Sequence, residues 1–165
     1  MSIINDFSRK VWVYVLRTKD QVFGRFKEWK ALVENQTEKK LKVLRTDNGL
    51  EYYNKMFDEF CSREGIVRHI TVRLTPQQNG LAERMNRTLM EKVRCMMIQS
   101  ELPKGLWVET LLTTCMLVNL SPSSALDFKT PHEKWCGKPT DYNKLKMFGC
   151  TAMHMQTKES LHQEH

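Results

Sequence analysis

A long helical pattern over residues 81–99 constrains the fold of this 165-residue chain more than any other stretch. The residues that recur at helical spacing on one side are apolar, namely Leu81, Met85, Leu89, Val93 and Met96. The opposite side carries Glu83, Arg87, Met90 and Arg94. Because an apolar stripe of this length has to be buried, we expect the helix to cover a core and to hold Glu83 on its solvent side.

Strand-like runs alternate with helical patterns along the chain. Runs rich in β-branched residues lie at 11–16, 42–45 and 66–72, after a shorter apolar piece at 3–4. Amphipathic helices are expected at 22–35, between Asn54 and Gly65, and at 103–118. After Ser121 the sequence is turn-rich, and we expect single aromatic residues to anchor it: Phe128, Trp135, Tyr142 and Phe148. The alternation predicts an α/β protein.

The charge balance favours a polyanionic partner. The chain has 26 Lys and Arg against 19 Asp and Glu, a net charge of +7 and a pI near 9.2. Such an excess attracts nucleic acid but defines neither fold nor chemistry. The five cysteines form no C-x-x-C pair, so neither a disulfide framework nor a common zinc site is indicated. No apolar run is long enough to span a bilayer, and residues 1–10 lack a signal peptide, so we expect no membrane partner.

Two acidic residues, Asp47 and Glu83, are the candidates for chemistry. Asp47 follows a strand-like run in LRTDNG, and Glu83 follows TPQQNG, with 35 residues between the two acids. An Asn-Gly pair between apolar runs is a strong hairpin signal, so Asp47 is also explained as a turn residue. Glu83 is equally explained as a surface acid that pairs with Arg87 one helical turn further on.

A catalytic interpretation accounts for the same two acids. Two-metal phosphoryl transfer uses carboxylates to hold two divalent ions, and Mg²⁺ prefers such oxygen ligands. A strand-end acid and a helix acid converge where the helix packs on the sheet. The nearby Arg84, Arg87 and Arg94 would then neutralise phosphates beside the ions.

Several motifs in order give the chain a strong resemblance to the integrase catalytic core of copia-type LTR retrotransposons. The segments LRTDNGLEYYNKMFDEFCSREGI and TPQQNGLAERMNRTLMEKVRCMM carry most of it. The resemblance covers residues 3–153. Outside the two segments it is carried by residues 5–9, Leu102-Pro103, Trp107, Asn119, Pro122-Ser123, Thr130-Pro131, Trp135 and Phe148-Gly149-Cys150. The family belongs to the DDE/retroviral integrase superfamily and is encoded within Pol polyproteins.

The resemblance implies an RNase H-like fold, a mixed sheet flanked by helices, and a DDE-type polynucleotidyl transferase. In that family an Asp, a second Asp and a Glu bind two Mg²⁺ (or Mn²⁺) ions. Water trims the cDNA ends, and the freed 3′-hydroxyl attacks target DNA. Asp47 in T-D-N-G matches the second acid, and Glu83 in N-G-x-x-E-R-x-N matches the third. Both are therefore expected as catalytic and metal-binding residues.

The same resemblance implies DNA contacts on and before the long helix. Asn86 and Arg87, one turn beyond Glu83, match positions near DNA, and Asn79 with Gly80 matches the loop before the helix. With the neighbouring arginines, the expected nucleic-acid-binding residues are Asn79, Arg84, Asn86, Arg87 and Arg94.

The chain departs from the family pattern at its N-terminal end. The family's first catalytic Asp lies on a strand upstream of D-F-S-R, whereas Met1 falls inside the region that matches the second strand. Asp6 follows that strand and is a poor substitute. The family's sheet order is 3-2-1-4-5, so we expect the central strand to be missing and the strands on its two sides to have no shared neighbour. An incomplete acidic triad predicts weak metal binding and little strand transfer.

The expected organisation is an N-terminally truncated integrase core over 1–120, a turn-rich post-core segment over 121–155, and a polar, disordered tail over 156–165. The expected role is DNA integration, with retroelement cDNA ends and target DNA as partners and a homo-oligomer as one possible assembly. In that role the chain is expected in the nucleus; no targeting signal is visible, and outside that role the expected location is cytoplasmic or unknown. Two alternatives stay open: a non-catalytic nucleic-acid-binding or domesticated module, and a functionless transposon remnant.

Overall fold

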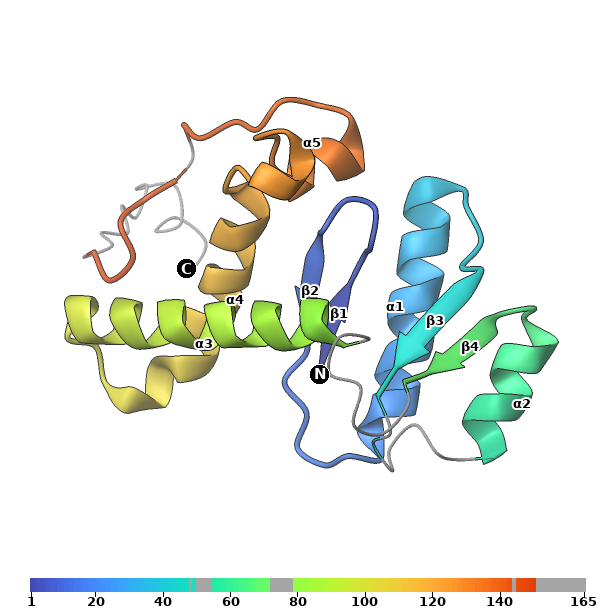
Figure 1. Cartoon of the computed structure of the whole chain (residues 1–165). Coiled ribbons are helices and arrows are strands. Elements are labelled where there is room, and N and C mark those ends of the chain that lie inside the picture. Colours follow the sequence, from blue (N-terminus) through green and yellow to red (C-terminus); the bar gives the residue numbers. More distant parts are fainter. Residues whose placement is uncertain (48, 50–54, 72–78, 144, 151–165) are drawn as a thin grey trace, which may run out of the picture.

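A computed structural model of the chain describes residues 1–47, 49, 55–71, 79–143 and 145–150. In chain order the elements are β1 (Ser2–Ile4), β2 (Val11–Val13), α1 (Gln21–Thr37), β3 (Val43–Thr46), α2 (Lys55–Arg63), β4 (Val67–Ile70), α3 (Gly80–Ser100), α4 (Trp107–Leu120) and α5 (Pro131–Cys136). Short 3₁₀ turns at Lys104–Leu106 and Ser124–Leu126 flank α4. Figure 1 shows α3, α4 and α5 gathered on one side of β1 and β2, with α1, α2, β3 and β4 on the other.

The described strands form two separate pairs. β1 and β2 pair antiparallel, with Ile3 opposite Trp12. β3 and β4 pair parallel, with Val43 opposite Val67, and α2 lies in the crossover that a parallel pair requires. Among the described residues no strand joins the two pairs. The predicted α/β class is confirmed.

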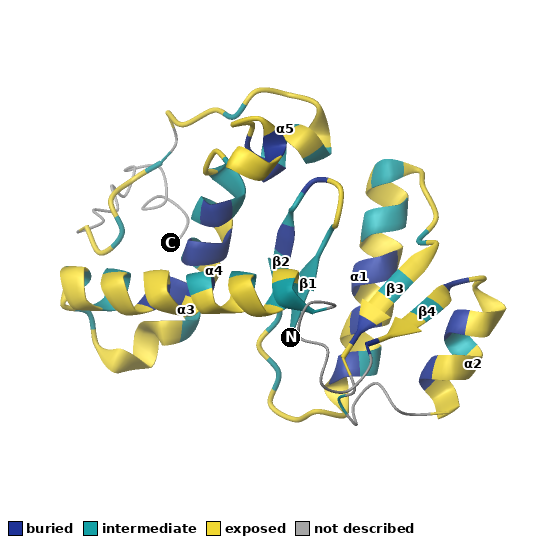
Figure 2. Cartoon of the chain, viewed as in Figure 1, coloured by how far each residue is buried: buried dark blue, intermediate teal, exposed yellow. Residues whose placement is uncertain are grey.

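Two apolar clusters hold these elements together. The first lies between β2 and helices α3 and α4, and it consists of Val11, Leu89, Val93, Leu111, Cys115 and Val118. The second lies between α1 and α2, and it consists of Phe26, Trp29, Phe57, Cys61 and Ile66. Side chains alternate between the two faces of β1, so Ile4 packs against the first cluster and Ile3 against the second. Figure 2 shows the buried positions on the inner faces of α1 and α4.

Helix α1 underlies both strand pairs. The cluster around Phe26 and Trp29 takes in Ile3 from β1 and Leu44 from β3. The two pairs therefore rest against the same helix, as two parts of one sheet layer would.

A nearly buried ion-pair network fixes α1 to the end of α2. The Lys30 ammonium donates to Glu34 at 2.9 Å and to Glu64 at 3.0 Å. Burial alone would lower the pKa of Lys30, but hydrogen bonds to the two carboxylates raise it overall. Glu34 also accepts a hydrogen bond from the Leu41 amide at 2.8 Å, so one carboxylate positions the start of the segment that leads into β3.

Several boundaries differ from the sequence expectation. β2 ends at Val13, although the β-branched run continues to Leu16. Its partner β1 spans only Ser2–Ile4, and the pairing closes with hydrogen bonds between Tyr14 and Met1. Strand length here is thus set by the available partner and not by propensity.

The region after α4 is more ordered than its turn-rich composition predicts. Helix α5 forms because Thr130 caps it, accepting from the Glu133 amide at 3.0 Å while Glu133 accepts from the Thr130 amide at 2.9 Å. Trp135 is an anchor as expected, with its ring 5.0 Å from that of Trp12. Phe128 is not an anchor, because 77% of it is exposed.

Candidate functional site

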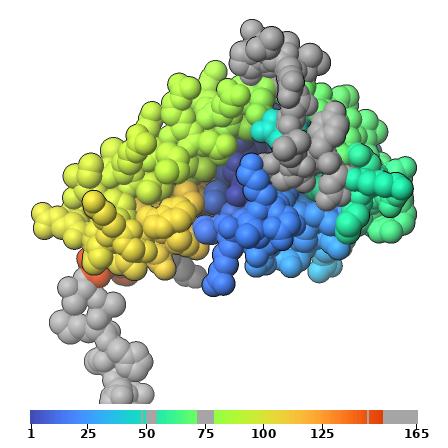
Figure 3. All heavy atoms as spheres, turned by 90° about the horizontal axis from the view of Figure 1, so that it is seen from below, coloured from blue at the N-terminus to red at the C-terminus, as the bar shows by residue number. Residues whose placement is uncertain are grey.

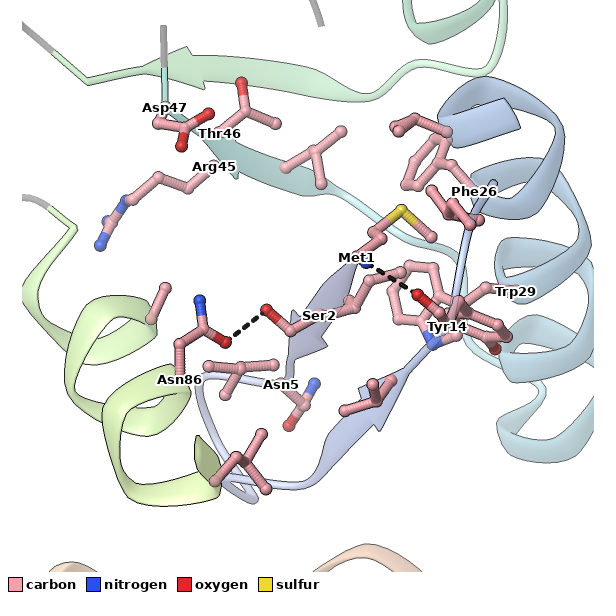
Figure 4. A pocket seen from close by; sticks show the side chains of 18 of the residues that line it. Met1, Ser2, Asn5, Tyr14, Phe26, Trp29, Arg45, Thr46, Asp47 and Asn86 are labelled. Carbon is pink, nitrogen blue, oxygen red and sulfur yellow. Dashed lines mark hydrogen bonds between the residues drawn. The ribbon is translucent and has the colours of Figure 1, made fainter. Parts of the chain in front are cut away.

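A pocket of about 1240 Å³ separates the two strand pairs. Its walls include β1, β3, the inner face of α1 and the first turns of α3. Figure 3 shows the N-terminal strand recessed between α3 and the segment that follows β2. Figure 4 shows that polar side chains (Arg45, Asp47 and Asn86) lie at one end of this inter-sheet pocket, and aromatic side chains (Phe26 and Trp29) at the other.

Asp47 lies at the polar end of the inter-sheet pocket, directly after β3. Its carboxylate is exposed, and one oxygen accepts from the Gly49 amide at 3.2 Å. This contact is a local turn interaction of the kind that Asp often makes two residues ahead of itself. The second strand of the alternative hairpin would fall on residues 50–53, which lie outside the described residues.

Glu83 lies in the first turn of α3 and is exposed. Its amide donates to the Asn79 carbonyl at 3.1 Å, which begins the helix. Within the described part of the chain the Glu83 carboxylate makes no ion pair with Arg87. Glu83 is not among the residues that line the inter-sheet pocket.

The start of α3 reaches the polar end of the pocket. Asn79 and Asn86 both line it, and the Asn86 side-chain oxygen accepts from the Ser2 hydroxyl at 2.8 Å. This hydrogen bond fixes the first turns of α3 against β1. The structure therefore brings Asp47 to the same pocket as Asn79 and Asn86, which come much later in the sequence.

The three predicted arginines are exposed on α3. Arg84, Arg87 and Arg94 make no ion pair with an acidic residue in the described ranges, so their charge is not neutralised by the protein there. By helical position, Arg87 and Arg94 share the side of α3 that carries Glu83, whereas Arg84 projects from another side.

The donor chemistry of the site fits a hard divalent cation. Asp47 and Glu83 supply exposed carboxylate oxygens, the ligand type that Mg²⁺ selects. Over the described residues, no group of three or more His, Cys, Asp or Glu side chains is close enough to hold a metal ion.

Sequence reasoning missed the residues on the pocket walls that belong to neither acidic motif. Ser2, Arg45 and Trp29 come from three different elements, and only the tertiary fold places them together. Arg45 was detectable, because it lies two residues before Asp47 and alternation along a strand puts both side chains on one face.

No protein-family model matches the chain. Over 159 residues, 96% of this chain, it is 52% identical to the retrovirus-related Pol polyprotein from transposon TNT 1-94 of Nicotiana tabacum. Over 149 residues, 90% of this chain, it is 33% identical to the corresponding polyprotein from transposon RE2 of Arabidopsis thaliana. The chain spans 12% and 10% of the length of these two relatives.

Two solved integrase structures share the fold. One is the HTLV-2 integrase catalytic core domain in complex with magnesium, in a trimeric form, with a TM-score of 0.59, 20% identity and 79% of each chain covered. The other is the simian T-cell lymphotropic virus intasome in complex with PP2A regulatory subunit B56 gamma, with a TM-score of 0.65 and 17% identity. That match covers 94% of this chain and 53% of the other.

The fold is accordingly that of a retroviral integrase catalytic core, RNase H-like as the sequence resemblance implied. The chain is similar to one segment, about a tenth of the length, of retrovirus-related Pol polyproteins from plant transposons. None of its described helices combines the length and apolar character needed to cross a membrane.

Proposed function

We propose that this chain is part of the integrase core of a copia-type element and acts in DNA integration. The observation that carries the proposal is the placement of Asp47 and the first turns of α3 around one pocket in an integrase fold. DNA ends and target DNA are the proposed substrates. The proposed place of action is the nucleus, where target DNA lies.

Asp47 and Glu83 would hold a divalent metal ion, which supplies Lewis-acid stabilisation of phosphate oxygens when bound. The chain's own residues have distinct tasks in this proposal. Asp47 is held by the Gly49 amide, and Asn86 is held by Ser2, so both polar groups are oriented before DNA arrives. The exposed cations Arg87 and Arg94 bind phosphates on the same side of α3 as Glu83.

We further propose that the chain by itself performs little 3′-end processing or strand transfer. Two carboxylates alone hold a pair of divalent ions poorly, because each ion needs several oxygen ligands from protein or substrate. A third acidic ligand would complete the set, as the resemblance to DDE enzymes implies. Self-assembly into an oligomer also belongs to the proposal, since the similar HTLV-2 core is described in dimeric and trimeric forms.

A joining assay tests the proposed function. A short labelled DNA duplex is incubated with the chain and Mn²⁺ or Mg²⁺, and joined products are compared with those of the Glu83→Gln variant. Glu91→Gln is the matched control, because Glu91 is another exposed acid on α3. We expect DNA binding, with joining no greater than that of Glu83→Gln. If the unmodified chain joins DNA, and this activity is lost in Glu83→Gln but kept in Glu91→Gln, the incomplete triad is contradicted and an active site is established.

A non-catalytic nucleic-acid-binding module is the second candidate. The observation that favours it is the set of exposed arginines on α3 whose charge no acidic residue in the described ranges neutralises. Binding of DNA with no metal dependence at all would favour this module, whereas binding strengthened by Mn²⁺ through Asp47 and Glu83 would favour the integrase core.

A further inference from the structure

The β3–β4 pair has one face that packs on α1 and α2 and one face that is exposed to solvent. Leu44 joins the apolar cluster between these helices, and the Arg68 guanidinium lies 5.0 Å from the centre of the Phe57 ring, so both side chains point toward the helices. Successive residues of a strand point to opposite faces. The alternate residues therefore form an outer sheet face, and all of them are exposed: Val43, Arg45, Val67 and His69.

Arg45 and His69 stand side by side on this outer sheet face. They are opposite each other in the register of the parallel pair, and neighbouring strands lie about 4.8 Å apart. Over the described residues, neither side chain has an ion-pair partner. An arginine carries five N–H donors and a histidine at least one. The two side chains therefore present several donors to solvent at one place, which is what an anion needs.

Other arginines in this half of the molecule are neutralised by the protein. Arg68 pairs with Asp58, and its side chain is only 9% exposed. Arg63, at the end of α2, pairs with Glu64 at 3.7 Å. The described arginines that make no ion pair with a described acidic residue are Arg17, Arg45, Arg84, Arg87 and Arg94. Apart from the first, they belong to β3 and α3, the two elements that position the candidate acids.

The two donors also lie close to Asp47. Asp47 follows Arg45 by two residues, about 6.6 Å along a strand, and alternation puts both side chains on one face. Successive nucleotides of one strand of a DNA duplex are about 3.4 Å apart along the axis. A DNA strand with one phosphate at Asp47 therefore brings a phosphate one or two nucleotides away within reach of Arg45. Figure 4 shows the Arg45 side chain extended from β3 toward the first turns of α3.

We propose that Arg45 and His69 form a phosphate-binding subsite for a DNA strand that has a neighbouring phosphate at Asp47. The Arg45 guanidinium donates to two oxygens of the phosphate, and the His69 imidazole donates to the same phosphate from the adjacent strand. The bound DNA then crosses from α3 onto the outer sheet face, in the direction of β4. This inference rests on the proposed function, because it takes DNA as the ligand beside Asp47.

Salt-dependent binding of a short labelled DNA duplex, followed by fluorescence anisotropy without divalent metal, tests the role of Arg45. Arg45→Gln should reduce the magnitude of the slope of log affinity against log salt by about 0.9, the value for one phosphate contact. Arg63→Gln is the matched control, because it removes the same charge from the same half of the molecule. It should leave the slope unchanged.

A charge-conserving variant separates the shape of the side chain from its charge. Arg45→Lys should keep the slope but bind more weakly, because lysine cannot donate to two oxygens in a fork. Circular dichroism checks that each variant folds. A slope for Arg45→Gln equal to that of the unmodified chain, or equal changes in Arg45→Gln and Arg63→Gln, would overturn the proposal.

Duplexes in which one phosphate at a time is replaced by a neutral methylphosphonate locate the contact on the DNA. One replacement should weaken binding by the unmodified chain and have no effect on the Arg45→Gln/His69→Gln double variant, because that variant has already lost the contact. Each single variant should be intermediate, since one donor to the phosphate is left. If every replacement costs the double variant as much as it costs the unmodified chain, the two side chains contact no phosphate and the proposal fails.

Inorganic phosphate distinguishes a DNA contact from a general anion site. The His69 ring signals are followed by NMR at constant ionic strength, and we expect the duplex to shift them and to displace any bound phosphate. A shift by inorganic phosphate that the duplex fails to reverse would overturn DNA as the ligand. DNA binding that depends on Arg87 and Arg94 but not on Arg45 would overturn this inference alone, whereas an unmodified chain without salt-sensitive DNA binding would overturn the proposed function as well.

Discussion

Asn119 on α4 closes the outer edge of β2 by forming two hydrogen bonds with the backbone of Val11, each 2.8 Å long. Val11 is 1% exposed, so neither bond is readily replaced by water. The Asn119 side chain supplies the two hydrogen bonds that a neighbouring strand would otherwise form with Val11, and it connects β2 to α4.

Replacing Asn119 with leucine should therefore destabilise the fold by about 2 kcal/mol, because the Val11 amide and carbonyl lose their paired partner in a buried position. Urea unfolding measures the change. Asn119→Asp keeps the acceptor and loses the donor, and it should lie between the wild type and the leucine variant at pH 7. A loss below about 0.5 kcal/mol for Asn119→Leu would show that the edge is closed by other contacts.

Lys30→Met tests the buried network between α1 and α2. The substitution leaves the Glu34 and Glu64 carboxylates without their shared cation, and Glu34 is only 12% exposed at its side chain. We expect a loss of about 3 kcal/mol in the free energy of unfolding. Arg25→Met on the same helix is the control, because the Arg25–Glu28 pair is more than half exposed and should contribute under about 1 kcal/mol. Equal losses in the two variants would contradict a special role for Lys30.

The same network predicts how stability depends on pH. For Glu34, burial opposes ionisation, but hydrogen bonds from Lys30 and the Leu41 amide lower its pKa overall from the ordinary 4.5. Lys30 and its hydrogen bond lower the pKa of Glu64 as well. A carboxylate with a lowered folded-state pKa contributes stability above its ordinary pKa, and that stability is lost as the pH falls through the folded-state value.

Unfolding free energies measured from pH 7 downward should therefore fall once the pH passes below about 4.5. The Glu34→Gln variant should show a smaller decrease over the same range, since one of the two linked carboxylates is gone. The raised pKa of Lys30 has the opposite sign, so its contribution is complete below pH 10.5 and is lost above it. An acid dependence unchanged by Glu34→Gln would contradict the assignment.

DNA binding by α3 is testable through its salt dependence. Arg87→Ala combined with Arg94→Ala removes two exposed cations from the side of the helix that carries Glu83. If both contact phosphates, the slope of log affinity against log salt should decrease in magnitude by about 2. Lys129→Ala with Lys138→Ala removes the same charge near α5 and should change the slope much less. Equal changes would indicate attraction by net charge alone.

The sequence predicted the helices well where they are long and amphipathic. Leu89 and Val93 are buried on the predicted stripe of α3, whereas Leu81 on the same stripe is 39% exposed. Leu81 lies on the wall of the inter-sheet pocket, where no side chain packs fully against it. Periodicity identified the correct face of the helix but does not determine how closely each residue on that face is packed.

Short elements and long-range placement were harder to predict. α5 has six residues, too few for a helical period, although the Thr130–Glu133 capping pair with Pro131 at the first helical position was visible in the sequence. Trp107 stands at the first turn of α4, the helix expected to be amphipathic, and is 45% exposed. The meeting of Asp47 with the start of α3 depends on tertiary packing, which motif spacing alone does not determine.

Whether Asp47 and Glu83 share one metal site is tested most directly by paramagnetic broadening of backbone amide signals during an Mn²⁺ titration. We predict that the Asp47 and Glu83 amides broaden at the same Mn²⁺ concentration, and that Asp47→Asn removes the broadening at both. The Glu91 amide on the same helix should be affected much less. Broadening at Glu83 that persists in the Asp47→Asn variant, or that is equal at Glu91, would contradict a shared site.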